Sequence, residues 1–259
     1  MGLLVSFISA FFWAFFDLAR KICLKKIDPY NFLILFSLFQ FIFFFIWILF
    51  SNYRFDLVKY ITPGVILVSI NVLSGILFLK SLKISELSLT IPLLSFTPLF
   101  STIFSAFVLN ENLNVYQYFG ILLIVFGTMV LYAKSMKIID ICSSLKSLVS
   151  NLGAKYMLIV SIIWSITPVL DKVCFKYSSI NIHGLFQSIG MLFLLILLNF
   201  KNINFSTVSK KKIHIIVISI LIGTLATILQ YVAIKLTLVP LMETIKRTVG
   251  HMLSVFLGN

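Results

Sequence analysis

Three charged residues lie within one turn of a predicted helix, near the middle of an apolar segment. Glu243, Lys246 and Arg247 fall inside LTLVPLMETIKRTVGHMLSVFLG, which is long enough to cross a bilayer. A charge at that depth costs from about 2.5 to over 10 kcal/mol. The spacings of three and four residues place Glu243 on one helical face with both bases. One ion pair therefore forms and one positive charge is left over.

A surplus buried cation needs a counter-ion, such as a second carboxylate, a lipid phosphate or an anionic substrate. We expect this helix to face a wet cavity, where the surplus charge helps to hold an anionic group. The alternative is a structural ion pair beside a lysine that snorkels to the membrane surface. About ten residues, or about 15 Å of helix rise, separate the cluster from either end of the segment, which makes snorkelling awkward.

Two aspartates each follow a tryptophan by a whole number of helical turns. Asp17 comes four residues after Trp13, and Asp171 comes seven residues after Trp164, so each carboxylate lies on the face of its tryptophan. An intramembrane carboxylate can carry a coupling proton, because burial favours its neutral form. Asp17 lies further from a loop and is the expected coupling-ion site. The alternative is an ion pair at the helix end, with Arg20 or Lys21 for Asp17, and with Lys172 or Lys176 for Asp171.

Other polar side chains interrupt the apolar segments. Pro92 and Pro98 make the fourth predicted helix irregular, and each proline frees a carbonyl that hydroxyl groups or water must satisfy. Tryptophans away from helix ends favour a cavity wall or a seam between halves, although core packing explains them equally well. Each of these side chains can also serve as a helix–helix contact. The expected substrate cavity consists of Trp13, Asp17, Asn71, Ser74, Thr90, Ser95, Trp164, Gln230, Tyr231, Glu243, Lys246 and Arg247.

Signatures of enzymes and of ATP-driven pumps are missing from the sequence. It contains no Walker loop, HExxH or GxSxG pattern, and its three histidines do not have the spacing of metal ligands. We therefore expect no enzyme, no cofactor and no metal site. Any transport would be secondary, driven by a gradient.

The composition is that of a membrane protein. Of the 259 residues, 60% are hydrophobic and 11% are charged, and the mean hydropathy is +1.10. The net charge of +13 lies mostly in short gaps between apolar segments, which favours loops facing anionic lipid over nucleic-acid binding. We expect an all-α polytopic protein of a bacterial cytoplasmic membrane. Nine spans are predicted, at about 3–20, 31–50, 61–80, 85–109, 115–133, 156–175, 181–199, 213–234 and 238–257.

A weak internal repeat divides the chain. An offset of 151 residues aligns FWAFFDLARKICLKK with IWSITPVLDKVCFKY, and an offset of 152 aligns SLKISELSLTIPLL with AIKLTLVPLMETIK. We predict a first repeat at 1–133, a basic linker at 134–155 and a second repeat at 156–259. The first repeat has five helices and the second four, so a tenth helix is expected. A truncated gene, a frameshift or an incomplete sequence would each explain its absence.

An odd number of helices in each repeat gives the two repeats opposite orientations in the membrane. Inverted repeats are the usual architecture of secondary transporters, with substrate bound between the repeats near the midplane. Lys and Arg gather in the gaps after the first, third, fifth and seventh spans, which predicts an N-terminus outside the cytoplasm.

Several stretches resemble the drug/metabolite transporter superfamily, and in particular its EamA-type proteins with two five-helix repeats. They are FFWAFFDLARK and IIWSITPVLDK, LKSLKISELSLTIPLLSFTPLFSTIFSAFVLNENLN with YFGILLIVFGTMVLY, and YVAIKLTLVPLMETIKRTVGHMLSVFLG. The resemblance implies ten helices, a central cavity, a cytoplasmic N-terminus and movement of small metabolites. The chain departs from it by lacking the second acidic turn and the tenth helix. The implied orientation conflicts with the charge bias, so the topology stays open.

The predicted function is gradient-driven transport of small polar metabolites by alternating access. Two kinds of cargo remain open, because an aromatic cavity favours amino acids or amines and the Lys-Arg pair favours anionic or phosphorylated metabolites. The resemblance adds that related transporters of phosphorylated metabolites carry an adjacent Lys-Arg in the ninth helix. The alternative to transport is a non-transporting remnant, or a subunit that needs a partner chain. The expected partners are a small-molecule substrate and membrane lipid, and no nucleic acid. Association of several copies of this chain into a homo-oligomer is a further alternative.

Overall fold

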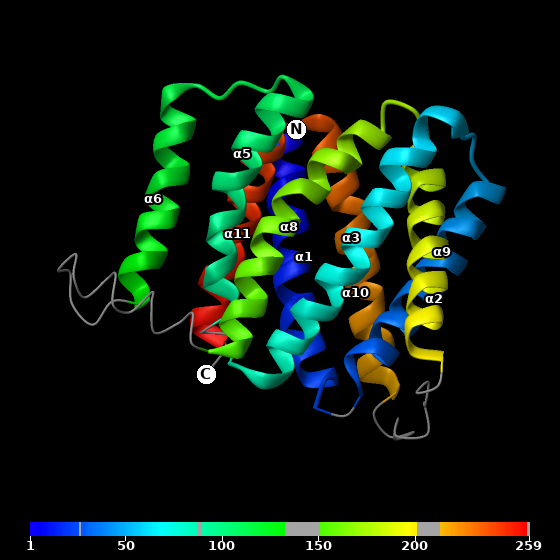
Figure 1. Ribbon diagram of the computed structural model, residues 1–259, viewed down its shortest axis with the longest axis horizontal. Coiled ribbons are helices and arrows are strands. Elements are labelled where there is room, and N and C mark those ends of the chain that lie inside the picture. The colour runs from blue at the N-terminus through cyan, green and yellow to red at the C-terminus, as the bar shows by residue number, and fades with distance from the viewer. Residues whose placement is uncertain (26, 87–89, 133–150, 201–212, 258–259) are drawn as a thin grey trace.

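The chain is described by a computed structural model that covers residues 1–25, 27–86, 90–132, 151–200 and 213–257 (Figure 1). These residues form nine α-helices and one 3₁₀ helix, arranged as a bundle. Their bounds are α1 Gly2–Cys23, α2 Pro29–Leu49, α3 Leu57–Ile84, η1 Ile91–Ser95, α5 Phe96–Leu109, α6 Val115–Tyr132, α8 Leu152–Cys174, α9 Ile180–Asn199, α10 Ile213–Leu236 and α11 Val239–Leu257.

The predicted all-α polytopic membrane fold is confirmed. Seven of the described spans are long and apolar enough to cross a membrane, including the span formed by η1 and α5 together. The helix α6 offers a shorter apolar stretch, Val115–Gly127. The helix α11 is 19 residues long but carries the three charges noted above. The protein is therefore an integral membrane protein.

Helix boundaries differ from the predicted ones where a capping residue or a proline decides them. The helix α8 begins at Leu152 because the Asn151 side chain accepts the N–H of Ala154 at 3.1 Å, so the end of the predicted linker is helical. Residues 134–150 of that linker lie outside the described residues. The fourth span is not one helix over 85–109, because it starts as the 3₁₀ helix η1 with Pro92 in its first turn.

Helices from the two predicted repeats pack against each other in a reciprocal pattern (Figure 1). The helix α1 packs against α10 and α11, and α8 packs in the corresponding way against α3 and α5. Two further pairs, α2 with α9 and α5 with α11, join equivalent helices of the two halves. Exchanging the halves thus maps the contacts of α1 onto those of α8, and it maps the α2–α9 and α5–α11 contacts onto themselves. Such reciprocal packing is typical of inverted-repeat membrane proteins.

Two lysines make equivalent contacts near the ends of the first helix of each half. The Lys21 ammonium donates to the backbone carbonyl of Ser85, and the Lys172 ammonium donates to the carbonyl of Thr237 at 2.6 Å. The lysines differ by 151 positions and the carbonyls by 152, which are the two offsets of the sequence alignment. The boundaries of the repeats themselves remain a prediction.

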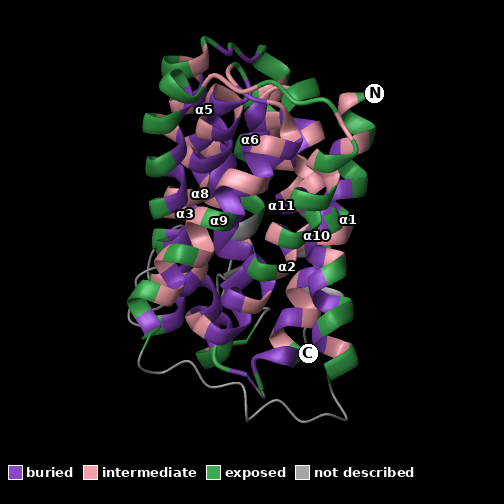
Figure 2. Ribbon diagram, turned by 90° about the vertical axis from the view of Figure 1, so that its right-hand side faces the viewer, coloured by how far each residue is buried: buried purple, intermediate pink, exposed green. Residues whose placement is uncertain are grey.

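Exposed residues lie on the outer faces of the bundle and buried residues lie between the helices (Figure 2). Many of the exposed residues are large and hydrophobic, and many polar side chains are buried. Large hydrophobic residues such as Phe107, at 83% exposure, lie on the outside, whereas hydroxyl and charged groups such as Ser101 and Glu243 are enclosed. This distribution suits a protein in lipid, where polar groups must find partners inside the bundle.

We expect that replacing Gly184 by valine lowers the free energy of unfolding by about 1–3 kcal/mol, the usual cost of overpacking a filled core. A Cβ atom at Gly184 of α9 would lie 2.4 Å from ring carbons of Phe44 in α2, and that ring is fully buried. The matched control is Gly120→Val in α6, where no atom lies within 4 Å of the added Cβ. Apparent melting temperatures in detergent measure both effects, and an equal shift in the two variants would contradict the prediction.

Candidate functional site

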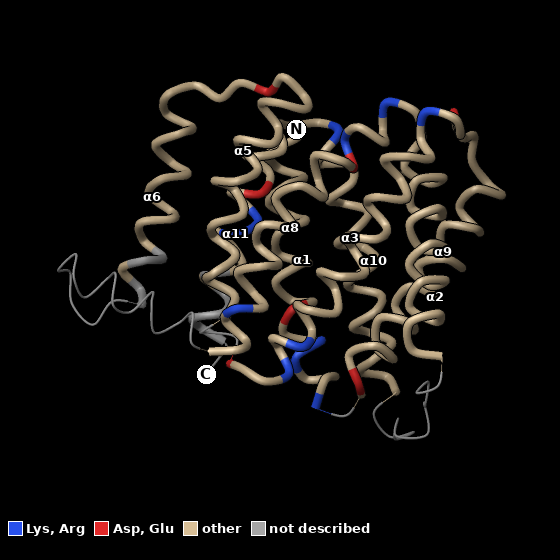
Figure 3. The backbone as a smooth tube through the Cα atoms, viewed as in Figure 1, with Lys and Arg blue, Asp and Glu red and all other residues tan. Residues whose placement is uncertain are grey.

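A central cavity lies between helices of both halves, with an empty volume of about 810 Å³. Its wall is mostly aromatic and polar, and it includes the charged part of α11. Figure 3 shows that charged residues gather toward the two ends of the bundle, whereas α11 carries both signs within its length. The lining residues are Trp13, Arg20, Leu33, Phe36, Gln40, Asn71, Gly75, Trp164, Thr167, Asp171, Met191, Thr227, Gln230, Tyr231, Glu243, Lys246 and Arg247.

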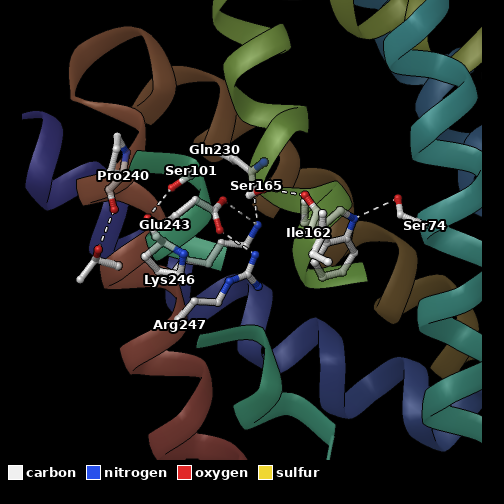
Figure 4. A network of polar contacts seen from close by, with 12 residues as sticks. Ser74, Ser101, Ile162, Ser165, Gln230, Pro240, Glu243, Lys246 and Arg247 are labelled. Atoms are coloured by element: carbon white, nitrogen blue, oxygen red, sulfur yellow. Dashed lines mark hydrogen bonds and ion pairs between the residues drawn. The ribbon is translucent and has the colours of Figure 1, made fainter. Parts of the chain in front are cut away.

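The charged residues of α11 form a compact buried cluster (Figure 4). Arg247 donates to Glu243 Oε2 at 2.6 Å, the i,i+4 pair that the spacing indicates. The Lys246 ammonium lies 3.8 Å from Glu243 Oε1, but it donates to the side-chain oxygen Oε1 of Gln230 at 2.5 Å. Glu243 is 1% exposed and Arg247 5% exposed, so the cluster is shielded from lipid and solvent. The closest polar partner of Lys246 is thus a neutral amide.

Two tryptophans from equivalent helices flank Lys246. Its ammonium lies 4.4 Å from the ring centroid of Trp13 in α1 and 5.8 Å from that of Trp164 in α8. Arg247 also lies over Trp164, at 5.4 Å. The Trp164 indole is fixed by donating to the Ser74 hydroxyl of α3 at 3.1 Å. The aromatic faces favour a cation at this position.

A second ion pair lies in α1. Arg20 binds Asp17, which is one of the pairings that the sequence left open, and its guanidinium lies 3.9 Å from the ring centroid of Phe78. Arg20 lines the main cavity, whereas Asp17 faces a smaller neighbouring recess that also contains Lys246 and Arg247. The coupling role expected of Asp17 stays a prediction.

Asp171 does not pair with either lysine that the sequence suggested, and that alternative is wrong. Its Oδ1 lies 2.9 Å from Nε2 of His183 in α9, and Nδ1 of His183 lies 2.8 Å from the Tyr60 hydroxyl in α3. Lys172 points in a different direction from α8 and binds Glu111 at 2.5 Å. Neighbours in sequence thus have separate partners, because adjacent residues of a helix point in different directions.

Family comparison decides what kind of protein contains this cavity. The EamA-like transporter family matches residues 1–133, slightly more than half of the chain. The chain belongs to the EamA-like transporter family. It is also similar to "Uncharacterized transporter YoaV" of Bacillus subtilis (strain 168), with 32% identity over 106 residues. That alignment covers 41% of this chain and 32% of the relative, so it spans about a third of the relative's length.

Most of the expected cavity residues of this EamA-like protein do meet at one place. Eight of the twelve line the main cavity, namely Trp13, Asn71, Trp164, Gln230, Tyr231, Glu243, Lys246 and Arg247. The other four lie outside its lining. Ser74 supports Trp164, and Asp17 pairs with Arg20. Thr90 donates to the backbone carbonyl of Glu86 at 2.9 Å, and the buried Ser95 hydroxyl has no partner among the described residues.

The predicted cavity set omits several residues that line this EamA-like cavity. Gln40 of α2 donates to the Thr227 hydroxyl of α10 at 3.1 Å, and both line the cavity with Thr167. Each is a polar residue inside an apolar span, which is a usable signal. Arg20 had the same signal, but it was considered only as a partner for Asp17.

Proposed function

We propose that this chain moves a small anionic metabolite across a bacterial cytoplasmic membrane, driven by a gradient, through the central cavity. The observation that supports this proposal is the placement of Lys246. Its positive charge lies in the cavity wall between two tryptophans, with a neutral amide as its nearest partner. A cation in such a place is stabilised by a visiting anion.

The charges around the cavity support an anionic cargo. Arg247 is paired with Glu243, and Arg20 is paired with Asp17. The Asp171 carboxylate, which also lines the cavity, is bound by the His183 imidazole. Among the described residues, Glu243 is the only carboxylate within 4.0 Å of the Lys246 ammonium, and it is closer to Arg247. The Nε atoms of Arg20 and Arg247 are buried and have no hydrogen-bond partner among the described residues. Arginine donors and a lysine charge converging on one space suit a phosphate, sulfate or carboxylate group.

Reciprocal packing of the two halves supports alternating access. The helices that meet across the halves, α1, α3, α5, α8, α10 and α11, would rock about the cavity and expose it to one side at a time. The sequence contains no nucleotide-binding motif. The energy would therefore come from the gradient of the cargo or of a coupling ion.

A binding screen followed by uptake tests the proposal. Purified protein in lipid nanodiscs is heated with a sugar phosphate, a dicarboxylate, sulfate, an alkyl amine or a neutral sugar. We expect an anion to stabilise the protein, by about 2.7 kcal/mol at a hundred times its Kd. That anion should then enter proteoliposomes that contain the protein. Stabilisation by the amine alone would favour the other cargo class and overturn the proposal.

Replacing Lys246 by glutamine should weaken anion binding by at least about tenfold, because a hydrogen bond to a charged group contributes about 1.5–3 kcal/mol. This change keeps the pair between Glu243 and Arg247 intact. Lys246→Arg should retain binding, and Lys59→Gln, at an exposed position on α3, is the matched control. Normal uptake by the double variant Lys246→Ala, Arg247→Ala would contradict a role for the cluster in transport.

A further inference from the structure

We propose that Asp171, His183 and Tyr60 form a proton-binding site in the wall of the cavity. The three side chains come from α8, α9 and α3, and they form one continuous chain of hydrogen bonds. Nε2 of His183 faces the Asp171 carboxylate at 2.9 Å, and Nδ1 faces the Tyr60 hydroxyl at 2.8 Å. Both ring nitrogens thus lie beside an oxygen that can accept a hydrogen bond, which is the arrangement that an imidazolium requires.

Burial isolates this site from bulk solvent except at one end. His183 and Tyr60 are 0% exposed and Asp171 is 4% exposed. Asp171 lines the central cavity, whereas His183 and Tyr60 lie behind it. Asp171 is therefore the member of the site that faces the cavity. Gln187 donates to the Gly64 carbonyl at 3.2 Å and to the Tyr60 hydroxyl at 3.4 Å, which closes the far end.

Aromatic rings hold the imidazole in place. Phe175 and Tyr231 lie edge-to-face with His183, with ring centroids 4.7 and 5.0 Å away. A ring fixed in this way keeps both nitrogens aimed at their oxygen partners when the proton is gained or lost. In the neutral form Nε2 donates to Asp171 and Nδ1 accepts the Tyr60 proton. In the protonated form both nitrogens donate, and the Tyr60 oxygen accepts.

Titratable and apolar side chains from the surrounding helices face the site. The titratable ones are Tyr60 of α3, Asp171 and Cys174 of α8 and Tyr231 of α10; α2 contributes the apolar Phe44. Two cations lie further out. Lys235 is 5.9 Å from the Phe175 ring, and Arg54 donates to the Lys176 carbonyl at 2.7 Å. Asp171 is thus the carboxylate that contacts the imidazole, and its charge is the one that stabilises an imidazolium.

Protonation changes the charge of the cavity wall. Without the extra proton the pair carries one negative charge, and with it the pair is neutral. An anion held by Lys246 is therefore bound more tightly when the proton is present, so proton and anion binding reinforce each other. This link to transport rests on the proposed function, whereas the protonation of His183 does not.

Nuclear magnetic resonance of protein labelled with ¹⁵N-histidine tests the site directly. The chain has three histidines, and His183→Gln assigns the signal. We expect the ring nitrogens of His183 to change from neutral to protonated between pH 9 and pH 5. The change should be lost in Asp171→Asn and kept in His214→Gln, which removes an exposed histidine. A His183 signal that stays neutral throughout the titration of folded wild-type protein would overturn the proposal.

Sulfate binding tests the coupling separately, because sulfate stays a dianion over this pH range. We expect wild-type protein to bind sulfate at least about tenfold more tightly at pH 6 than at pH 8, because the negative charge removed from the cavity wall repels both charges of the dianion. His183→Gln and Asp171→Asn should remove this pH dependence. Equal binding at both pH values in wild-type protein would overturn the coupling. Failure of sulfate to bind at either pH would contradict the anion site and leave the magnetic resonance result to decide the proton site.

Discussion

Replacing Glu243 by glutamine is expected to lower the free energy of unfolding by about 3–5 kcal/mol, the usual cost of removing one partner of a buried ion pair. Glu243 is the carboxylate that lies 2.6 Å from Arg247 and 3.8 Å from Lys246. Its removal leaves two adjacent cations in the interior. The apparent melting temperature in detergent should fall by roughly 10 °C. The control is Glu86→Gln, at an exposed position that should be nearly neutral.

The double variant Glu243→Gln, Arg247→Gln identifies the cause. It removes one cation together with the carboxylate, so we expect it to recover much of the lost stability. If the double variant is as unstable as the single one, the damage comes from lost packing rather than from unpaired charge. The two measurements together thus separate the electrostatic contribution of Glu243 from the packing contribution of its side chain.

The second large effect is expected at Glu111, which lies between α5 and α6. Its carboxylate binds the Lys172 ammonium at 2.5 Å and accepts the N–H of Val239 at 2.9 Å. It therefore joins the end of α8 to the start of α11. Glu111→Gln should cost about 3 kcal/mol, because Lys172 keeps its charge in a largely buried position without its partner.

A matched control for Glu111 is Asp56→Asn. Asp56 also accepts a backbone N–H at a helix start and pairs with a lysine, but both side chains of that pair are exposed. We expect a loss of at most about 1 kcal/mol there. Thermal unfolding of the two variants side by side measures the difference. Equal losses would show that burial of the Lys172 pair contributes nothing.

The helices could be predicted from the sequence because each is a long apolar run between short polar gaps. The contact between Glu243 and Arg247 could be predicted too, because it depends only on the geometry of one helix. Contacts between helices could not. Gln230 and Lys246 meet because α10 and α11 both pack against α1, and the register of that packing cannot be read from the sequence.

The series of hydrogen bonds from Asp171 through His183 to Tyr60 is the clearest example of a contact that could not be predicted from the sequence. Asp171 and His183 are 12 positions apart, and Tyr60 is 123 positions from His183. Only the crossing of α3, α8 and α9 brings the three together. The nearest bases in sequence, Lys172 and Lys176, were the natural partners to expect for Asp171, but they point in other directions along the helix end.

The tryptophans that flank Lys246 also give the protein a built-in optical signal. Trp13 and Trp164 line the cavity, whereas the third tryptophan, Trp47, packs against Phe43 and Phe44 within α2. An occupant that displaces the Lys246 ammonium from the indole faces changes the polarity around two of the three indoles. Intrinsic fluorescence is therefore expected to report, without a label, the binding of any occupant that moves Lys246 or contacts the two indoles.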